Sequence, residues 1–397
     1  MKLTFVSNYI NHHQMPLAGR LYEKLKSDYC FIQTMPMEKE RSDMGWAADV
    51  TKIPYVKCFY EEEEECRKII MDSDVVIFGG VEDESYIEER LQAGKPVIRY
   101  SERIYREGQW KAISPRGLLK KYHDHIRYRK APVYLLCAGA YVASDFALIQ
   151  AYPGKKYCFG YFPAFKEQNI EQLMEKKRKR REESGKVRIL FAARFLTLKH
   201  PEYPVHLAKA LKDEGVSFEL FMIGDGEEKG NVSAEIEKLG LQEDVKFLGF
   251  LSPEEVREQM EEADIFLFTS DYREGWGAVV NESMNSGCAL IAGHGIGAVP
   301  YLLKDGENGY VHRTGVPAEF IKAGVRLAKD REAMEAFGRA SYRIIAEEWN
   351  DKVAAERLYE LCEGIVSGNI VSPDSGPCSE APVIKPGKGY EYMKRKV

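Results

Sequence analysis

The stretch Arg273-Glu-Gly-Trp-Gly-Ala-Val-Val-Asn-Glu-Ser-Met-Asn-Ser-Gly287 decides how the second half of this chain folds. The apolar run Ile265–Phe268 precedes it, and a short apolar run bounded by polar residues is typical of a buried strand. From Ala278 to Gly287 the apolar residues recur at helical spacing. The stretch therefore predicts a strand, a loop and a helix, in that order.

Two acids, Glu274 and Glu282, stand eight positions apart in this stretch. We expect Glu274 in the loop and Glu282 about two turns into the helix, on nearly the same face. Gly275 and Gly277 let the loop backbone approach a ligand closely, and amides at a helix N-terminus suit a phosphate group. A pair of solvated acids beside an ordinary turn would show the same spacing, so their place after a buried strand is what favours a ligand site.

The length and composition indicate a globular protein of two domains. A chain of 397 residues is longer than a domain with a single hydrophobic core usually is. Its 44% hydrophobic and 30% charged residues are typical of globular proteins. A net charge of −5 gives no field that would attract nucleic acid. The eight cysteines form no C-x-x-C pair, no signal-peptide core follows Met1, and no segment reaches the ~20 apolar residues of a membrane span. These features favour the cytoplasm.

Two series of short apolar runs alternate with helical segments, a pattern typical of parallel sheets covered by helices. The first series opens with a strand at Leu3–Ser7, and the second opens at Val187. We therefore expect an α/β fold with two Rossmann-like domains. The expected division is a first domain over residues 1–166, a charged linker over 167–186, a second domain over 187–345, a helix returning toward the first domain over 346–366, and a poorly ordered or surface-draped tail over 367–397.

Two basic residues, Arg194 and Lys199, follow the strand that opens the second series. Ligands of open α/β sheets bind at the carboxyl ends of the strands, where these cations could neutralise a diphosphate. Either residue alone is more simply explained as a solvated basic side chain. Together with Glu274 and Glu282 on the same edge, they favour a ligand site.

These segments resemble the family-4 glycosyltransferases, also called glycosyl transferases group 1. Ala193–His200 carries the family's Arg and, after four intervening residues, its Lys, and Glu274–Glu282 matches its E-x7-E motif. Phe221–Gly226 and Val245–Gly249 are similar to other parts of its donor domain, in the same order. The resemblance covers residues 187–311, whereas the first domain is similar only in its strand–helix outline.

The resemblance implies the GT-B fold, in which two Rossmann-like domains face each other across a cleft. It implies an acceptor-binding first domain, a second domain that binds a nucleotide-sugar donor, transfer with retention of configuration, and no bound metal or other cofactor. The implied catalytic residues are Glu274, near the reacting carbon, and the diphosphate-binding Arg194 and Lys199. The implied donor site adds Glu282 on the ribose and the backbone of Gly275, Trp276 and Gly277.

The first domain departs from the family at one position. Many members carry a His in a loop that contacts the donor sugar, but the loop after Val97–Tyr100 reads Ser101-Glu-Arg103. Glu102, His12 and His13 are therefore alternative candidates for the cleft of the first domain. The triplet Asp72-Ser-Asp74 matches the D-x-D of metal-dependent transferases but directly precedes a strand, where turn and capping acids are common, so no metal site is expected.

The expected function is transfer of a sugar to a glycan or lipid-linked acceptor in cell-envelope or exopolysaccharide biosynthesis. A nucleotide-sugar epimerase on the same fold and a non-catalytic sugar- or partner-binding module are the alternatives, because fold alone does not settle function. The basic segments Lys120–Lys130 and Lys176–Arg181 predict contact with anionic lipid at the inner face of the membrane. A solvated linker or helix end is the simpler interpretation of the second segment, and a solvated face or an acceptor surface is the simpler interpretation of the first.

Overall fold

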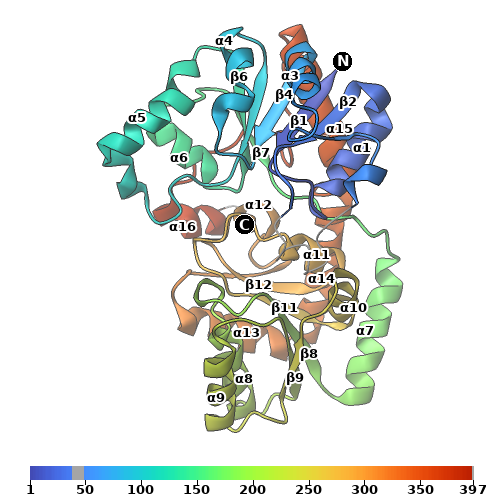
Figure 1. The fold of residues 1–397 in the computed structure, drawn as a ribbon. Helices are drawn as coiled ribbons and strands as arrows, with labels where there is room; N and C mark the ends of the chain where they lie inside the picture. The colour runs from blue at the N-terminus through green and yellow to red at the C-terminus, as the bar shows by residue number, and fades with distance from the viewer. Residues whose placement is uncertain (38–48, 396–397) are drawn as a thin grey trace. The chain divides into compact units, whose positions relative to one another are not determined.

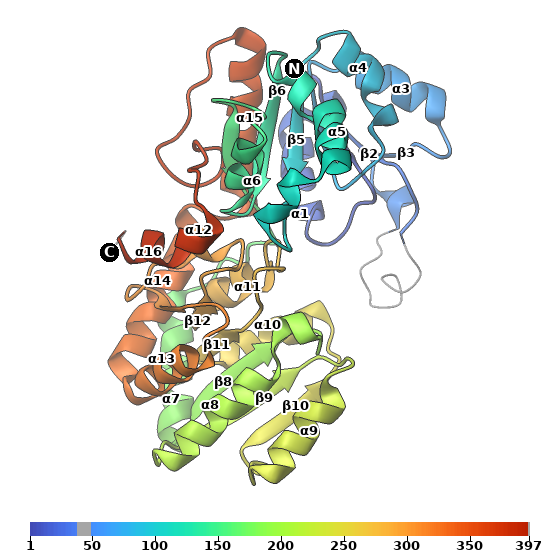
Figure 2. The same ribbon diagram turned by 90° about the vertical axis from the view of Figure 1, so that its left-hand side faces the viewer.

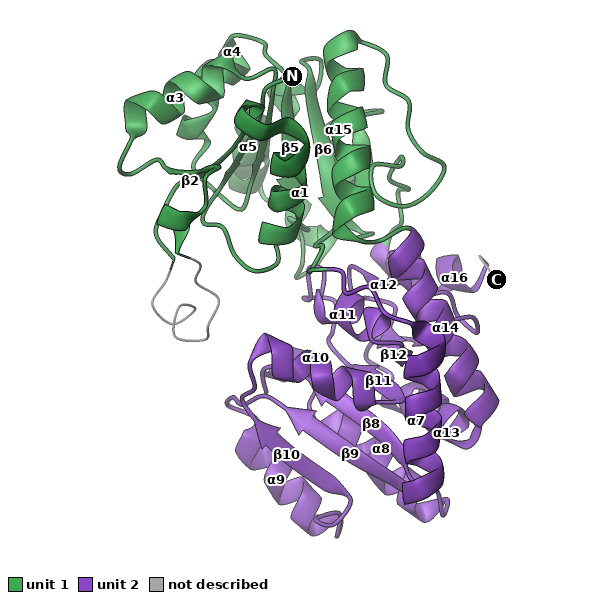
Figure 3. Cartoon of the chain, turned by 90° about the vertical axis from the view of Figure 1, so that its right-hand side faces the viewer, with its two compact units in different colours: residues 1–164, 348–385 green, residues 165–347, 386–397 purple. Residues whose placement is uncertain are grey.

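The computed structural model describes residues 1–37 and 49–395, which form two compact units (Figures 1 and 3). Unit 1 comprises Met1–Ala164 and Glu348–Lys385. Unit 2 comprises Phe165–Glu347 and Pro386–Val397. Each unit is a parallel sheet covered by helices, so the predicted α/β fold with two Rossmann-like units is confirmed.

The sheet of unit 1 has the strand order β3-β2-β1-β4-β5-β6-β7, with all pairs parallel. The sequence pattern did not indicate β2 or β3. The strands are β1 (Leu3–Ser7), β2 (Tyr29–Gln33), β3 (Val56–Cys58), β4 (Val75–Gly79), β5 (Val97–Ser101), β6 (Val133–Ala138) and β7 (Lys156–Phe159). Its α-helices are α1 (Met15–Leu25), α3 (Glu63–Asp72), α4 (Glu88–Gln92), α5 (Pro115–Asp124), α6 (Val142–Leu148) and α15 (Asp351–Ser367).

The sheet of unit 2 has the order β10-β9-β8-β11-β12-β13, so the chain reverses its direction of growth between β8 and β11. Its strands are β8 (Val187–Ala192), β9 (Phe218–Ile223), β10 (Val245–Gly249), β11 (Ile265–Phe268), β12 (Ala289–Gly293) and β13 (Gly309–His312). Its helices are α7 (Ile170–Ser184), α8 (Glu202–Asp213), α9 (Lys229–Lys238), α10 (Pro253–Glu262), α11 (Val279–Asn285), α12 (Val299–Leu302), α13 (Pro317–Lys329), α14 (Arg331–Glu347) and α16 (Gly389–Lys394). The crevice at such a reversal is the usual ligand position in open α/β sheets.

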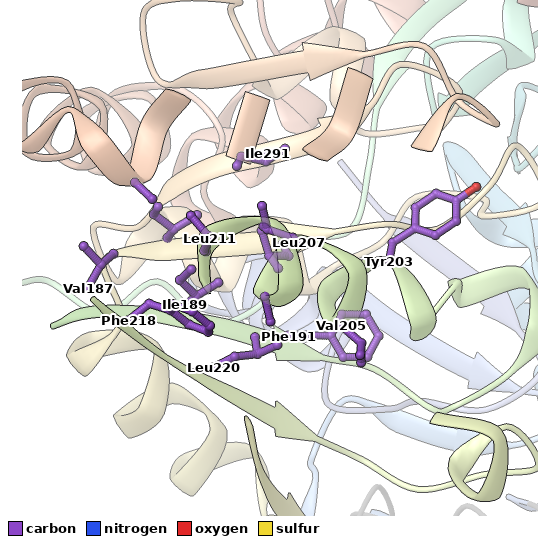
Figure 4. Packing of buried hydrophobic residues seen from close by; sticks show 14 of the residues in the cluster. Val187, Ile189, Phe191, Tyr203, Val205, Leu207, Leu211, Phe218, Leu220 and Ile291 are labelled. Carbon is purple, nitrogen blue, oxygen red and sulfur yellow. The ribbon is translucent and has the colours of Figure 1, made fainter. Parts of the chain in front are cut away.

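The core of unit 2 fixes the strands whose ends carry the predicted site. Ile189 on β8, Leu220 on β9 and Leu207 on α8 belong to one buried cluster, and Figure 4 shows side chains of these elements gathered together. Gly324 on α13 packs directly on Leu207, since an added Cβ would lie 2.5 Å from that side chain. This close packing holds α8, and with it the loop after β8, in place.

The prediction of a charged linker over residues 167–186 is wrong, because most of this segment is helix α7 of unit 2. Lys177 is buried, and its Nζ donates to the carbonyl oxygens of Ala263 (2.6 Å), Ser286 (2.8 Å) and Gly287 (3.0 Å). Arg181 is also buried and forms an ion pair with Asp264. The charges that suggested a solvated segment therefore bind the helix to the unit.

Part of the tail that follows α15 packs into unit 1, where Cys378 and Ser379 are buried, so the prediction of a poorly ordered or surface-draped tail is wrong for these residues. Helix α15 packs against α1, where Arg20 Nε lies 2.8 Å from Asp351. The chain beyond α15 then runs antiparallel to the outer strand β7, with the Cys158 amide donating to Ser379 and the Cys378 amide to Cys158, both at 2.8 Å. Residues 386–397 belong to unit 2.

Candidate functional site

Two loops at the carboxyl end of the unit 2 sheet are tied to each other by hydrogen bonds. One follows β8 and carries Lys199; the other follows β11. The hydroxyl of Thr269 donates to the carbonyl oxygen of Lys199 (2.5 Å), and the amide of Asp271 donates to that of Leu198 (2.9 Å). The site residues predicted on separate strands are therefore held on one edge.

This arrangement brings two of the predicted catalytic residues into direct contact. The ammonium of Lys199 forms an ion pair with the carboxylate of Glu274, and both side chains are mostly buried. Glu274 lies in the loop, as expected, where its amide donates to the carbonyl oxygen of Asp271 (3.1 Å). An acid and a base fixed together at a strand end form a polarised site for a charged, hydroxyl-rich ligand.

One glycine of this loop, Gly277, is required by the loop geometry. Gly277 has φ +90°, and a Cβ there would lie 2.2 Å from the ring of Phe268. Trp276 beside it is 1% exposed, and its indole N–H donates to Asn281 Oδ1 of α11 at 2.9 Å. The side chain of Trp276 therefore braces the loop from inside, while the loop backbone stays close to the edge of the sheet.

Glu282 lies one turn into α11, and the prediction of two turns is wrong because the helix starts only at Val279. Burial raises the pKa of Glu282 to about 7, and the nearby Arg257 guanidinium opposes this shift. Arg257 donates to Asn285 Oδ1 at 2.5 Å. Glu282 thus has an ionisation that changes near neutral pH.

Arg194 follows β8 and is exposed, with no ion-pair partner among the described residues. The loop after β9 packs on the backbone next to it, because a Cβ on Gly224 would lie 2.0 Å from the carbonyl oxygen of Ala193. A Cβ on Gly226 would likewise lie 2.5 Å from the carbonyl oxygen of Phe195. These glycines fix the backbone around Arg194 and leave its guanidinium open to an anion.

The candidates in unit 1 lie around Tyr161, a residue that the sequence pattern did not indicate. Its hydroxyl donates to Glu102 at 2.8 Å, and its ring centroid lies 6.4 Å from that of His13. The rings of His12 and His13 are 3.8 Å apart. Burial, followed by the charge of His12, lowers the pKa of His13 to about 3, so His13 is neutral at physiological pH.

The other candidates have structural surroundings. Asp74 of the D-x-D triplet accepts the Lys2 amide at 2.7 Å, and Asp72 ends helix α3. Among residues 1–37 and 49–395, no group of three or more His, Cys, Asp and Glu side chains is arranged to hold a metal ion. His294, in the loop after β12, accepts the Thr314 amide through Nδ1 at 3.1 Å. Within the same residues, no helix is both long enough and apolar enough to span a bilayer.

Comparison with known proteins places this geometry in a family. Residues 174–344 match the family described as glycosyl transferases group 1. Unit 2 is a group 1 glycosyltransferase domain. The match covers the tied loops, Arg194, Lys199 and the Glu274–Glu282 stretch, as the sequence resemblance predicted.

Curated relatives and solved structures extend the comparison. The chain is 26% identical over 182 residues to the amylovoran biosynthesis glycosyltransferase AmsK of Erwinia amylovora, which covers 45% of this chain and 44% of the relative. It is 25% identical over 265 residues to the alpha-D-kanosaminyltransferase of Streptomyces kanamyceticus, which covers 66% and 62%. These alignments span less than two-thirds of either relative's length. Anabaena HepE, solved in complex with UDP, superposes with a TM-score of 0.68 at 15% identity and covers 92% of this chain and 100% of its own. The chain has the GT-B fold.

Proposed function

We propose that the chain transfers a sugar from a nucleotide-sugar donor to a glycan or lipid-linked acceptor, with retention of configuration, in cell-envelope or exopolysaccharide biosynthesis. The observation that carries the proposal is the Lys199–Glu274 ion pair at the ends of β8 and β11, inside the group 1 domain. Names of the relatives support the biological setting, since AmsK is an amylovoran biosynthesis enzyme. Solved structures of HepE contain UDP and UDP-glucose, which supports a uridine diphosphate sugar as the first donor to test.

In the proposed reaction the cations of unit 2 stabilise the leaving group. The bond between the anomeric carbon and the diphosphate oxygen breaks, and negative charge grows on the phosphate as the sugar becomes oxocarbenium-like. Lys199 and Arg194 would stabilise this charge, since fixed cations lower a barrier most where charge develops. The acceptor oxygen forms the new bond to the anomeric carbon, and its proton passes to the departing phosphate.

Two carboxylates would act on the sugar and the ribose. Glu274 would accept hydrogen bonds from sugar hydroxyls and would stabilise positive charge at the anomeric carbon. Glu282 would accept the ribose hydroxyls as a carboxylate. The cluster of His12, His13, Tyr161 and Glu102 in unit 1 would contribute to acceptor or sugar binding.

The test uses the full chain and a panel of nucleotide sugars. A donor should first raise the melting temperature, because a ligand that binds only the native state stabilises it. The same donor with glycan and lipid-linked acceptors should then release a free nucleoside diphosphate and form a glycosylated product. An epimerase would change the sugar while the nucleotide stayed attached, and a binding module would be stabilised without turnover; either result overturns the proposal.

The reaction is also proposed to need no metal and to take place in the cytoplasm at the inner face of the membrane. Activity should survive a chelator such as EDTA. Complete loss with EDTA that manganese restores would instead assign Asp72 and Asp74 to a metal site.

A further inference from the structure

An exposed apolar surface on unit 1 has no role in the proposed transfer site. It lies in the segment of residues 110–122, which contains the short helical turn Gln109–Ile113 and most of α5. Trp110 is 69% exposed, Ile113 79%, Leu119 61% and Tyr122 51%, and Leu118 is also exposed. No residue of α5 is buried, although a helix of a globular protein normally buries an apolar stripe.

The apolar side chains of this segment form one surface. Leu118 and Tyr122 are four positions apart and Leu119 and Tyr122 are three apart, so they are neighbours along one side of α5. The turn with Trp110 and Ile113 packs against the start of the same helix. Figures 1 and 2 show α5 at the periphery of unit 1, away from its sheet.

Partly buried polar contacts hold both ends of the segment on unit 1. At the N-terminal end, Gln109 Nε2 donates to Ser144 (3.0 Å) and to Asp145 (2.9 Å) on α6. At the C-terminal end, the ring of His125 lies 2.7 Å from the hydroxyl of Tyr152. The exposed apolar surface is thus presented on a fixed base and is not a frayed end of the chain.

The surroundings of the segment are strongly basic. Residues 106–130 contain eight Lys and Arg against two acids, in a chain whose net charge is −5. Glu107 pairs with Lys111, and Asp124 pairs with Lys120 at 3.1 Å. Arg116, Arg129 and Lys130 are exposed and have no ion-pair partner within the described part of the chain.

We propose that the 110–122 segment is a docking surface for an anionic lipid bilayer. Trp and Tyr with adjoining Leu and Ile suit the boundary between headgroups and acyl chains, and surrounding Lys and Arg are attracted by anionic headgroups. A protein partner would account for the apolar residues, and a nucleic acid or an acidic glycan for the charge. A bilayer accounts for both together, and it goes beyond the transfer reaction because binding can be measured without a donor.

The other basic segment, Lys176–Arg181, does not form such a surface. Lys176 pairs with Glu262, Lys179 with Glu175, and Arg180 with Asp264, while Lys177 is buried among carbonyl oxygens. Its charges are therefore already balanced within unit 2, and the proposal rests on unit 1 alone.

The experiment is flotation of the full chain with vesicles of phosphatidylcholine alone and of phosphatidylcholine mixed with phosphatidylglycerol. We expect binding to the mixed vesicles only, weakened by salt. The double variant Ile113→Ser, Leu119→Ser should bind at least about tenfold more weakly, because two partly inserted apolar side chains are lost. Val371→Ser is the matched control, since Val371 is 76% exposed but lies outside the segment, and its binding should equal that of the parent.

A second measurement separates insertion from simple charge attraction. The emission of Trp110, taken as the difference between the parent and Trp110→Phe, should shift to the blue with the mixed vesicles. The double variant Arg116→Glu, Lys130→Glu should lose binding to the mixed vesicles and, with it, the dependence of binding on salt. Melting temperatures equal to that of the parent verify that all variants are folded. The proposal is overturned by equal flotation with and without phosphatidylglycerol, by binding that the Ile113 and Leu119 changes leave intact, or by binding to heparin without binding to vesicles. Self-association that the apolar changes abolish, without vesicle binding, overturns it as well.

Discussion

The two units carry similar sheets but differ in the chemistry at their strand ends. In unit 2 the carboxyl edge of the sheet carries the Lys199–Glu274 ion pair, and Lys177 donates to carbonyl oxygens at the C-terminal end of α11. In unit 1 the corresponding candidates are rings and a hydrogen-bonded acid, and His13 is neutral because burial lowers its pKa to about 3. A diphosphate needs fixed cations, whereas sugar hydroxyls can be bound by neutral rings and single acceptors. The difference therefore assigns the donor to unit 2 in the proposed function.

The largest expected effect tests the bracing of unit 2. Lys177→Ala should lower the free energy of unfolding by about 4 kcal/mol, because it leaves buried carbonyl oxygens without a donor and opens a cavity. The control Lys179→Ala changes an exposed lysine on the same helix that pairs with Glu175 at 3.6 Å, and its cost should stay below about 0.5 kcal/mol. Denaturant unfolding measures both. Equal costs for the two variants would show that these buried hydrogen bonds of Lys177 do not stabilise unit 2.

The second effect tests the charged edge itself. Glu274→Gln should reduce turnover about a hundredfold, equivalent to about 3 kcal/mol, while donor affinity changes little. The reason is that the carboxylate would stabilise positive charge present mainly in the transition state. Arg194→Ala should reduce donor affinity as well as rate, because its phosphate contact would exist already in the ground state. Steady-state kinetics with the true donor distinguish these patterns, and near-normal turnover of Glu274→Gln with only a raised Michaelis constant would refute its role.

The third effect tests Glu282 through its raised pKa. The pKa of Glu282 is higher in the folded state than in the unfolded state, so protonation of Glu282 favours the native state. This contribution to stability is complete below the unfolded pKa and is lost as the pH rises through the folded pKa of about 7. Glu282→Gln removes the cost of burying a charge, so it should stabilise the protein by about 2 kcal/mol near pH 8 and far less near pH 5.

The same variant should weaken donor binding, because an amide replaces the carboxylate proposed to accept the ribose hydroxyls. Melting curves across pH and donor titrations measure the two effects separately. A stability gain that is the same at both pH values would show that Glu282 does not titrate as its surroundings predict. A gain in stability with unchanged donor affinity would remove Glu282 from the donor site.

Much of unit 2 could be predicted from the sequence because its signals are local. Ile265–Phe268 is the predicted strand residue for residue, and the second series of strands opens at Val187, where β8 begins. The Arg194, Lys199 and Glu274 positions followed from strand ends and a motif. Local patterns suffice where each apolar run is a fully buried strand.

Other features depend on contacts between distant residues, which no local pattern contains. The charges of α7 are balanced by Asp264, which is 83 positions from Arg181, and by carbonyl oxygens 86 to 110 positions from Lys177. Strand β3 is short and only partly buried, so it has no apolar run. Tyr161 comes to Glu102 through the fold of unit 1, and its place in the sequence gives no indication of this contact.

The smallest expected effect concerns this contact. Tyr161→Phe keeps the ring beside His13 and removes only the hydroxyl that donates to Glu102 at 2.8 Å. If unit 1 binds the acceptor through this cluster, kcat/KM for the acceptor should fall by less than about tenfold, since one neutral hydrogen bond contributes about 1 kcal/mol. Donor affinity should not change, because the cations of the donor site belong to unit 2.

The control Tyr60→Phe removes a hydroxyl that accepts from Gln33 at 2.7 Å, elsewhere in unit 1, and should leave both constants unchanged. A loss of donor affinity in Tyr161→Phe alone would mean that the cluster contacts the donor sugar, and the chemical division between the two edges would then have to be abandoned.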